Sequence, residues 1–249
     1  MDPVRTVTIE TDDGPSEAYL AGAGPGVLFY MDAIGLRPQI AAMVGRIASW
    51  GYTVLAPNVF HRDGTAAQLA PTQDLTIRAN RDAFFAGGVM GRIRSLTPDR
   101  AGRDARAWMT TLAGVATAGP IGTTGYCMGA RLAVRTAGWF PDRVRAVGGF
   151  HGGGLATGAS DSPHLSVAGT TASYVFGHAD KDRSMTPPQV ELLEQALTQA
   201  AVPHRNEIYP GAAHGYTMAD TSEWHEPSAE RHYRELRELL DATLPGEGG

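Results

Sequence analysis

The stretch over residues 122–132 constrains the fold most strongly, because it predicts a buried strand that turns sharply into a helix. Cys127 stands at the turn, with Gly125 and Gly129 two residues to either side. Glycines suit these positions because the neighbouring strand and helix press against them. The turn would lift the sulfur above a sheet edge and aim the Met128 N–H, at the positive end of a helix, toward an incoming carbonyl oxygen. A buried, inert core cysteine is the alternative that this motif leaves open.

Short apolar segments alternate with helical patterns along the chain. The continuous apolar runs at 26–31 and 52–56 suit strands that are covered on both faces, as in a parallel sheet. Before them, β-prone segments at 4–11 and 16–21 flank an Asp-Asp-Gly-Pro turn and predict an antiparallel hairpin. The pattern predicts an α/β fold with a mostly parallel central sheet flanked by helices. Further elements are expected as strands at 144–150, 173–176 and 206–209, and as helices over 40–50, 97–115, 128–140, 186–201 and 226–243.

One segment, 58–96, fits no simple element in the sequence. Long segments of this kind in compact domains are usually functional lids or mobile surface loops. We therefore expect a single α/β domain over 1–249, with 58–96 as a lid or a substrate-binding excursion.

Composition limits the classes of partner. The formal net charge is −5 and no long basic run occurs, which argues against nucleic acid or an anionic membrane as a partner. The arginines between 92 and 106 are expected to cover a solvated helix face. A single cysteine excludes an internal disulfide. Without a signal-peptide pattern or an 18-residue apolar span, the expectation is a soluble cytoplasmic protein, monomeric or a small homo-oligomer.

Residues with catalytic potential follow four of the expected strands. Ligands of such sheets bind at the carboxyl ends of the strands. The residues there are Asp32, Cys127, Asp180 and His214. A nucleophile, an acid and a histidine in that order along the chain is the α/β-hydrolase order. Asp182 is a rival for the acid, but Asp180 is preferred because it directly follows the turn that begins at Gly177.

Cysteine chemistry at this site needs a base. The thiolate is the nucleophile, and a cysteine with an ordinary pKa of about 8.5 is only slightly ionised at neutral pH. His214 is the candidate base, and Asp180 would fix its tautomer and support the imidazolium. His178 and His151 also stand at strand ends and are candidates for pocket walls.

Four motifs, spread over nearly the whole chain, carry a family resemblance. They are Gly125-Tyr126-Cys127-Met128-Gly129, Gly177-His178-Ala179-Asp180, Gly211-Ala212-Ala213-His214-Gly215-Tyr216 and Met31-Asp32-Ala33-Ile34-Gly35. Together they resemble the dienelactone hydrolase family. The resemblance implies an α/β-hydrolase fold and a triad of Cys127, His214 and Asp180.

The same resemblance implies further roles at the site. The N–H groups of Met128 and Ala33 would form the oxyanion hole. Asp32 matches an acidic position where the family usually has a glutamate that holds the thiol proton in the resting state. Aspartate shortens the reach by one methylene, and a turn-forming or capping carboxylate is the alternative for Asp32.

Substrate contacts are less defined by the sequence. The family's founding members bind a substrate carboxylate with arginines, and Arg78 and Arg81 lie in the corresponding part of the chain. These two arginines and Tyr126 are the substrate-binding candidates. Arg37 and Arg62 also lie near strand ends. Solvated surface arginines and core packing of Tyr126 are the alternatives.

The predicted function is hydrolysis of small ester or lactone bonds through an acyl-thioester that water resolves, with a small-molecule ester or lactone as the only expected partner. No metal or organic cofactor is expected, because no H-E-x-x-H, C-x-x-C or G-x-G-x-x-G set occurs. Two alternatives remain. One is a broad carboxylesterase or thioesterase with the same triad, and the other is a non-catalytic thiol module for redox sensing or binding.

Overall fold

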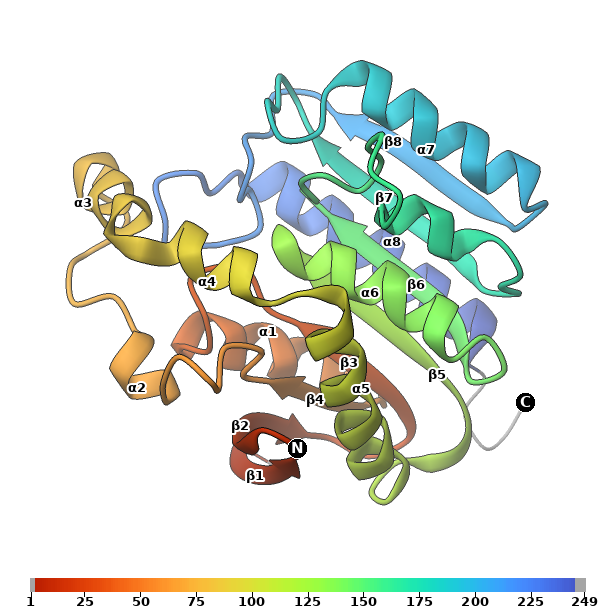
Figure 1. Ribbon diagram of the computed structural model, residues 1–249, viewed down its shortest axis with the longest axis horizontal. Helices are drawn as coiled ribbons and strands as arrows, with labels where there is room; N and C mark the ends of the chain where they lie inside the picture. The colour runs from red at the N-terminus through yellow and green to blue at the C-terminus, as the bar shows by residue number, and fades with distance from the viewer. Residues whose placement is uncertain (1–2, 245–249) are drawn as a thin grey trace.

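A single sheet of eight strands forms the centre of the computed structural model, which describes residues 3–244 (Figure 1). The strands are β1 (Arg5–Thr11), β2 (Gly14–Ala21), β3 (Pro25–Tyr30), β4 (Thr53–Pro57), β5 (Thr117–Tyr126), β6 (Val144–Phe150), β7 (Ser173–Ala179) and β8 (His204–Tyr209). Their order in the sheet is β1-β2-β4-β3-β5-β6-β7-β8. The pairs β1–β2 and β2–β4 are antiparallel, and the other neighbours are parallel. The predicted α/β fold with an antiparallel N-terminal hairpin is confirmed.

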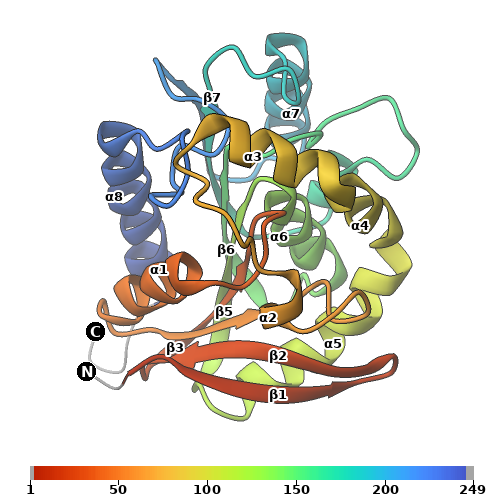
Figure 2. The same cartoon turned by 90° about the vertical axis from the view of Figure 1, so that its left-hand side faces the viewer.

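Helices cover both faces of this sheet. They are α1 (Pro38–Ala48), α2 (Ala66–Leu69), α3 (Arg78–Phe84), α4 (Met90–Ser95), α5 (Pro98–Ala113), α6 (Met128–Trp139), α7 (Pro187–Gln199) and α8 (Glu226–Thr243), with a π-helical turn η1 (Phe85–Val89) and a 3₁₀ turn η2 (Pro163–Val167). Figure 2 shows α1 and α8 on one face and α5 and α6 on the other. Because the central strands are covered on both sides, β3 and β4 are buried almost throughout, which explains their continuous apolar sequences.

The start of α5 follows from its sequence, but its end differs from the prediction. The Thr97 hydroxyl accepts a hydrogen bond from the Arg100 N–H, and Pro98 occupies the first helical position. The helix ends at Ala113, and Gly114 follows as its C-cap. Val115, the last residue of the expected helix, therefore lies outside it and is 47% exposed.

The segment 58–96 is not the unstructured excursion that the sequence indicated. It contains α2, α3, η1 and α4, each too short to show a helical period. Gly87 and Gly88 break the helical path, Gly88 with a φ of 104°. Figures 1 and 2 both place α4 beside α6, and Figure 1 shows α3 further out, away from α6.

The core lies between the sheet and its two helical layers. Its largest fully buried side chains include Trp108 of α5 and Tyr30 of β3. The Tyr30 hydroxyl is 2.6 Å from the Thr136 hydroxyl of α6, so this buried polar group is satisfied. Within residues 3–244, no helix combines the length and the apolar character needed to cross a bilayer.

Candidate active site

A strained turn joins β5 to α6 at Cys127, which has a φ of 54° and a ψ of −118°. Few residues other than glycine adopt such a backbone conformation. A Cβ atom on Gly125 would lie 2.2 Å from the carbonyl oxygen of Gly129. A Cβ atom on Gly129 would lie 2.5 Å from the carbonyl oxygens of Tyr30 and Met31. The elbow thus forms where the sequence predicted it, and both glycines are sterically required.

Three side chains from separate loops form a continuous hydrogen-bonded line. His214, in the loop after β8, places its Nε2 atom 3.1 Å from the Cys127 Sγ atom. Its Nδ1 atom lies 2.6 Å from Oδ2 of Asp182. The Asp182 carboxylate also accepts hydrogen bonds of 2.7 Å from both the N–H and the hydroxyl of Ser184, which hold it in place. The arrangement matches the geometry of a nucleophile, a base and an orienting acid.

The preference for Asp180 as the acid is wrong on this geometry. The Asp180 carboxylate accepts a hydrogen bond of 3.1 Å from the N–H of Gly211, and so fastens the end of β7 to the histidine loop. Lys181, which has a φ of 54°, then turns the chain. This turn brings Asp182, two residues further on, to the imidazole.

The cysteine and the histidine shift each other's pKa. Burial raises the pKa of the Cys127 thiol, but the charge and the hydrogen bond of His214 lower it further, so that it lies below its usual value. Burial lowers the pKa of His214, but the Cys127 charge and the hydrogen bond to Asp182 raise it to about 10. Both shifts favour a thiolate–imidazolium pair at neutral pH.

The sulfur faces a cavity of about 560 Å³. The cavity is bounded by the elbow, the loop after β3, the segment from α3 to α4, and loops after β6 and β7. Its lining residues are Ala33, Arg81, Phe85, Met90, Ile93, Arg94, Cys127, Met128, Arg131, Gly153, Gly154, Ser184 and His214. Cys127 is half-buried and lines this space, unlike the inert core cysteine that the motif alone left open.

Both predicted oxyanion-hole residues, Met128 and Ala33, line this cavity. The Met128 N–H lies at the N-terminus of α6, next to the Cys127 sulfur, and its proximity contributes to the lowered pKa of the thiol. Ala33 belongs to a loop that is held from within, because the Ile34 N–H donates to Oδ1 of Asp32 at 3.1 Å. Both residues thus lie beside the sulfur on the wall of one cavity, as the predicted oxyanion hole requires.

The predicted contact between the Asp32 carboxylate and the thiol is not made. Asp32 instead pairs with Arg37 at 2.7 Å, and the two side chains are only 5% and 3% exposed. Arg37 also bonds Asp220 at 2.6 Å and so is not a solvated surface arginine. Asp32 therefore has the alternative role, that of a carboxylate that forms the loop. Its negative charge still raises the pKa of Cys127.

Of the predicted substrate contacts, only Arg81 reaches the cavity. Its guanidinium lies 4.9 Å from the centre of the Phe85 ring. The Arg78 side chain is 67% exposed and pairs with Glu223 at 3.1 Å, outside the cavity. Tyr126 is fully buried, and its hydroxyl lies 3.2 Å from Nε2 of His232. Neither Arg78 nor Tyr126 therefore lines the cavity as predicted: Arg78 points to solvent from the start of α3, and Tyr126, one position before the elbow, points into the core.

The remaining polar candidates have structural partners. His151 bonds the Thr217 hydroxyl at 2.7 Å, and its ring lies 5.4 Å from that of His214, so it supports the histidine loop from below. His178 bonds Asn206 at 2.6 Å, between β7 and β8. Arg62 pairs with Asp104 and Asp13, on the side of the β1–β2 hairpin. Across residues 3–244, no three His, Cys, Asp or Glu side chains are grouped to hold a metal ion.

Sequence reasoning missed three residues that line the cavity or contact the histidine. Ser184 hydrogen-bonds both Asp182 and Nδ1 of His214. Arg131 lies four residues after Cys127 and therefore on the same side of α6, a spacing that could have revealed it. Arg94, expected on a solvated helix face, lines the cavity although it stays exposed, as do other residues of the short helix α4.

Fold and site together define an α/β-hydrolase with a cysteine at the elbow. The sequence signature of the dienelactone hydrolase family matches residues 15–244. A carboxymethylenebutenolidase from Rhodococcus opacus is 27% identical, over 85% of this chain and 77% of that protein. A Synechocystis protein provisionally named a carboxymethylenebutenolidase is 25% identical, over 96% of both chains. A crystal structure from Klebsiella pneumoniae, provisionally named a dienelactone hydrolase, superposes with a TM-score of 0.80 at 20% identity, covering 95% of this chain and 97% of that one.

The chain belongs to the dienelactone hydrolase family and is a carboxylic ester hydrolase.

Proposed function

We propose that this chain hydrolyses small esters or lactones by nucleophilic catalysis, with Cys127 as the nucleophile, His214 as the base and Asp182 as the orienting acid. One observation carries the proposal. The His214 ring bridges the Cys127 sulfur, at 3.1 Å, and the Asp182 carboxylate, at 2.6 Å, on the wall of a cavity of about 560 Å³.

Acylation begins from the thiolate–imidazolium pair. The Cys127 sulfur attacks the ester carbonyl carbon, and the carbonyl oxygen becomes an oxyanion that the N–H groups of Met128 and Ala33 stabilise. When the tetrahedral intermediate collapses, the C–O bond breaks and the leaving alkoxide takes the proton from Nε2 of His214. The acyl group remains on sulfur as a thioester.

Deacylation uses the same groups in the opposite sense. Neutral His214 takes a proton from a water molecule, and the resulting hydroxide attacks the thioester carbonyl. The intermediate expels the Cys127 thiolate and releases the carboxylic acid. Asp182 keeps the Nδ1–H tautomer of His214 in both half-reactions, so that Nε2 faces the reacting atoms.

Replacement of the nucleophile tests this proposal. We expect Cys127→Ala to abolish hydrolysis of small esters and of a dienelactone, while the variant keeps its fold by circular dichroism. Full activity of Cys127→Ala would refute the proposal. In the wild type, rapid mixing with an activated ester should show a burst of alcohol release equal to the enzyme concentration, as an acyl-enzyme requires when deacylation is the slower step.

The non-catalytic thiol module predicts a different outcome. In that case no ester is turned over, and His214→Ala leaves the reactivity of Cys127 unchanged. The hydrogen bond between His214 and the sulfur supports the enzymatic assignment, because an imidazole so placed activates the thiol.

A further inference from the structure

His151, the residue directly after β6, combines three unfavourable features in one position. Its backbone has a φ of 37°, in the left-handed region that is uncommon for residues other than glycine. Its imidazole is fully buried. Nε2 of the ring has a hydrogen-bond partner, but within residues 3–244 no group bonds the buried Nδ1 atom. Because strained residues and unpaired buried polar atoms concentrate at functional sites, these features indicate a function for His151.

The His151 side chain contacts three residues of the loop after β8, which carries His214. Its ring lies 5.4 Å from the His214 ring and 5.1 Å from the Tyr216 ring, both in edge-to-face geometry. Its Nε2 atom lies 2.7 Å from the Thr217 hydroxyl oxygen. Aromatic rings attract each other in this geometry, and the hydrogen bond fixes the distance between the ring and the loop. The position of the His214 imidazole therefore depends on the ring beneath it.

The backbone of His151 is tied to the same loop. The carbonyl oxygen of Gly177, in β7, accepts hydrogen bonds from the His151 N–H at 2.8 Å and from the Tyr216 hydroxyl at 3.1 Å. A Cβ atom on Gly177 would lie 2.7 Å from that hydroxyl oxygen, so a glycine is needed for this junction. His151 and the His214 loop thus share one fixed point on the sheet.

The His151 ring is neutral at neutral pH. Burial lowers its pKa well below the usual value, and the nearby charge of His214 lowers it further. A cation at this position would repel the imidazolium of the thiolate–imidazolium pair. A neutral imidazole avoids that repulsion and, unlike a phenyl ring, still bonds Thr217.

We propose that His151 is a positioning residue, which holds the His214 ring at the height at which Nε2 faces the Cys127 sulfur. The inference rests on the proposed function, because it concerns the base of that reaction. His151 acts through His214 and not on the substrate. Loss of the bond to Thr217 would let the imidazole move away from the sulfur, and a displacement of about 1 Å between reacting groups costs up to roughly 10² in rate.

Variants at both ends of the hydrogen bond test the inference. His151→Phe keeps an aromatic ring but loses the bond, and Thr217→Val removes the hydroxyl without changing residue 151. We expect each to lower kcat for a small ester about ten- to a hundredfold, with KM within about threefold of wild type. Thr217→Ser keeps a hydroxyl and should stay within about threefold of wild type in kcat. Should His151→Phe fail to fold, Thr217→Val and Thr217→Ser give the same comparison.

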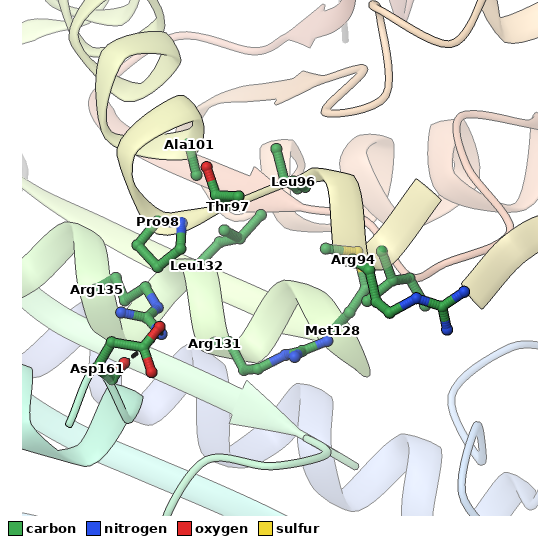
Figure 3. Close-up of a pocket in the computed structure, with 11 residues that line it drawn as sticks. Arg94, Leu96, Thr97, Pro98, Ala101, Met128, Arg131, Leu132, Arg135 and Asp161 are labelled. Carbon is green, nitrogen blue, oxygen red and sulfur yellow. Dashed lines mark hydrogen bonds and ion pairs between the residues drawn. The ribbon is translucent and has the colours of Figure 1, made fainter. Parts of the chain in front are cut away.

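Two control variants separate positioning from a loss of stability. His178→Phe is the matched control, because His178 is equally buried and also bonds one partner through Nε2, in its case Asn206 at 2.6 Å. Leu132→Ala is the second control. Leu132 is 5% exposed and lines a cavity of about 300 Å³ between α4, α5 and α6, whose lining residues all lie between 93 and 161 (Figure 3). Both controls should lower the stability but keep kcat within about threefold of wild type.

Alkylation of Cys127 by iodoacetamide reports the placement of His214 without any turnover. In His151→Phe and Thr217→Val the alkylation rate at pH 7 should fall and its rise should move to higher pH, because a displaced imidazolium lowers the thiol pKa less. An unchanged profile in both variants, or a loss of kcat no larger than that of His178→Phe, would overturn the inference. Failure of wild type to hydrolyse any ester would instead refute the proposed function, and the alkylation profiles would still decide whether His151 places His214.

Discussion

The Nδ1 atom of His214 lies 2.6 Å from the carboxylate of Asp182, whereas Asp180, two residues earlier, bonds the backbone N–H of Gly211. The two aspartates are close in sequence and equal in chemistry, so they provide a matched pair of variants. We expect Asp182→Asn to lower kcat by about 10²- to 10⁴-fold, because an amide can donate to Nδ1 and favour the wrong tautomer. Asp180→Asn should keep most of the activity, because an amide oxygen still accepts from Gly211. Steady-state kinetics of both variants on one ester would test this. A larger loss of kcat in Asp180→Asn than in Asp182→Asn would contradict the assignment of Asp182 as the orienting acid.

The lowered pKa of the Cys127 thiol should be measurable from the pH dependence of its alkylation rate. The thiolate is the reactive form, and the imidazolium of His214 lowers the thiol pKa. The alkylation rate with iodoacetamide should therefore already be high at pH 7, and its rise with pH should be centred below the value of about 8.5 for a free cysteine.

In His214→Ala the burial remains while the compensating charge is lost, so the thiol pKa should rise. We expect the alkylation rate at pH 7 to fall about tenfold or more, and the rise to move to higher pH. Ser184→Ala, which removes a hydroxyl that contacts both Asp182 and His214 but leaves the imidazole in place, is the milder comparison. A profile that does not respond to His214→Ala would show that the imidazole does not activate the sulfur.

The elbow glycines make a sharp prediction for stability. A methyl group at Gly125 would lie 2.2 Å from the Gly129 carbonyl oxygen and 2.7 Å from the Ala130 nitrogen, and backbone atoms cannot swing aside. We expect Gly125→Ala to lower the free energy of unfolding by about 3 kcal/mol or more, or to prevent folding. Gly91→Ala is the control, because Gly91 lies in α4 with no atom within 4 Å of an added methyl group. It should stabilise the protein by about 0.5–1 kcal/mol in urea unfolding.

Much of the fold and the elbow could be predicted because the responsible signals are local. Apolar runs mark the buried strands, Pro98 and Thr97 mark the start of α5, and the spacing of glycines around Cys127 marks the turn. The position of His214 beside the sulfur follows from chain order, since the carboxyl ends of parallel strands meet at one sheet edge.

The errors concern side-chain directions, which depend on tertiary structure. The choice between Asp180 and Asp182 turns on the left-handed conformation of Lys181, a residue type with no preference for it. The role of Asp32 depends on Arg37, whose partner Asp220 lies 183 residues away in the sequence. No local pattern reports a pairing over that separation.

The buried Arg37 joins the loop before α1 to the loop after His214, and this connection leads to the last prediction. Arg37 pairs with Asp32 at 2.7 Å and with Asp220 at 2.6 Å. Arg37→Met would leave the Asp32 carboxylate, 5% exposed, without its cation, and should lower the free energy of unfolding by about 3–5 kcal/mol. Arg237→Met, which removes an ion pair to Asp241 whose partners are both more than half exposed, should cost less than about 1 kcal/mol. If urea unfolding gave equal small losses for both variants, Asp32 would not depend on Arg37, and the linkage between the two loops would be refuted.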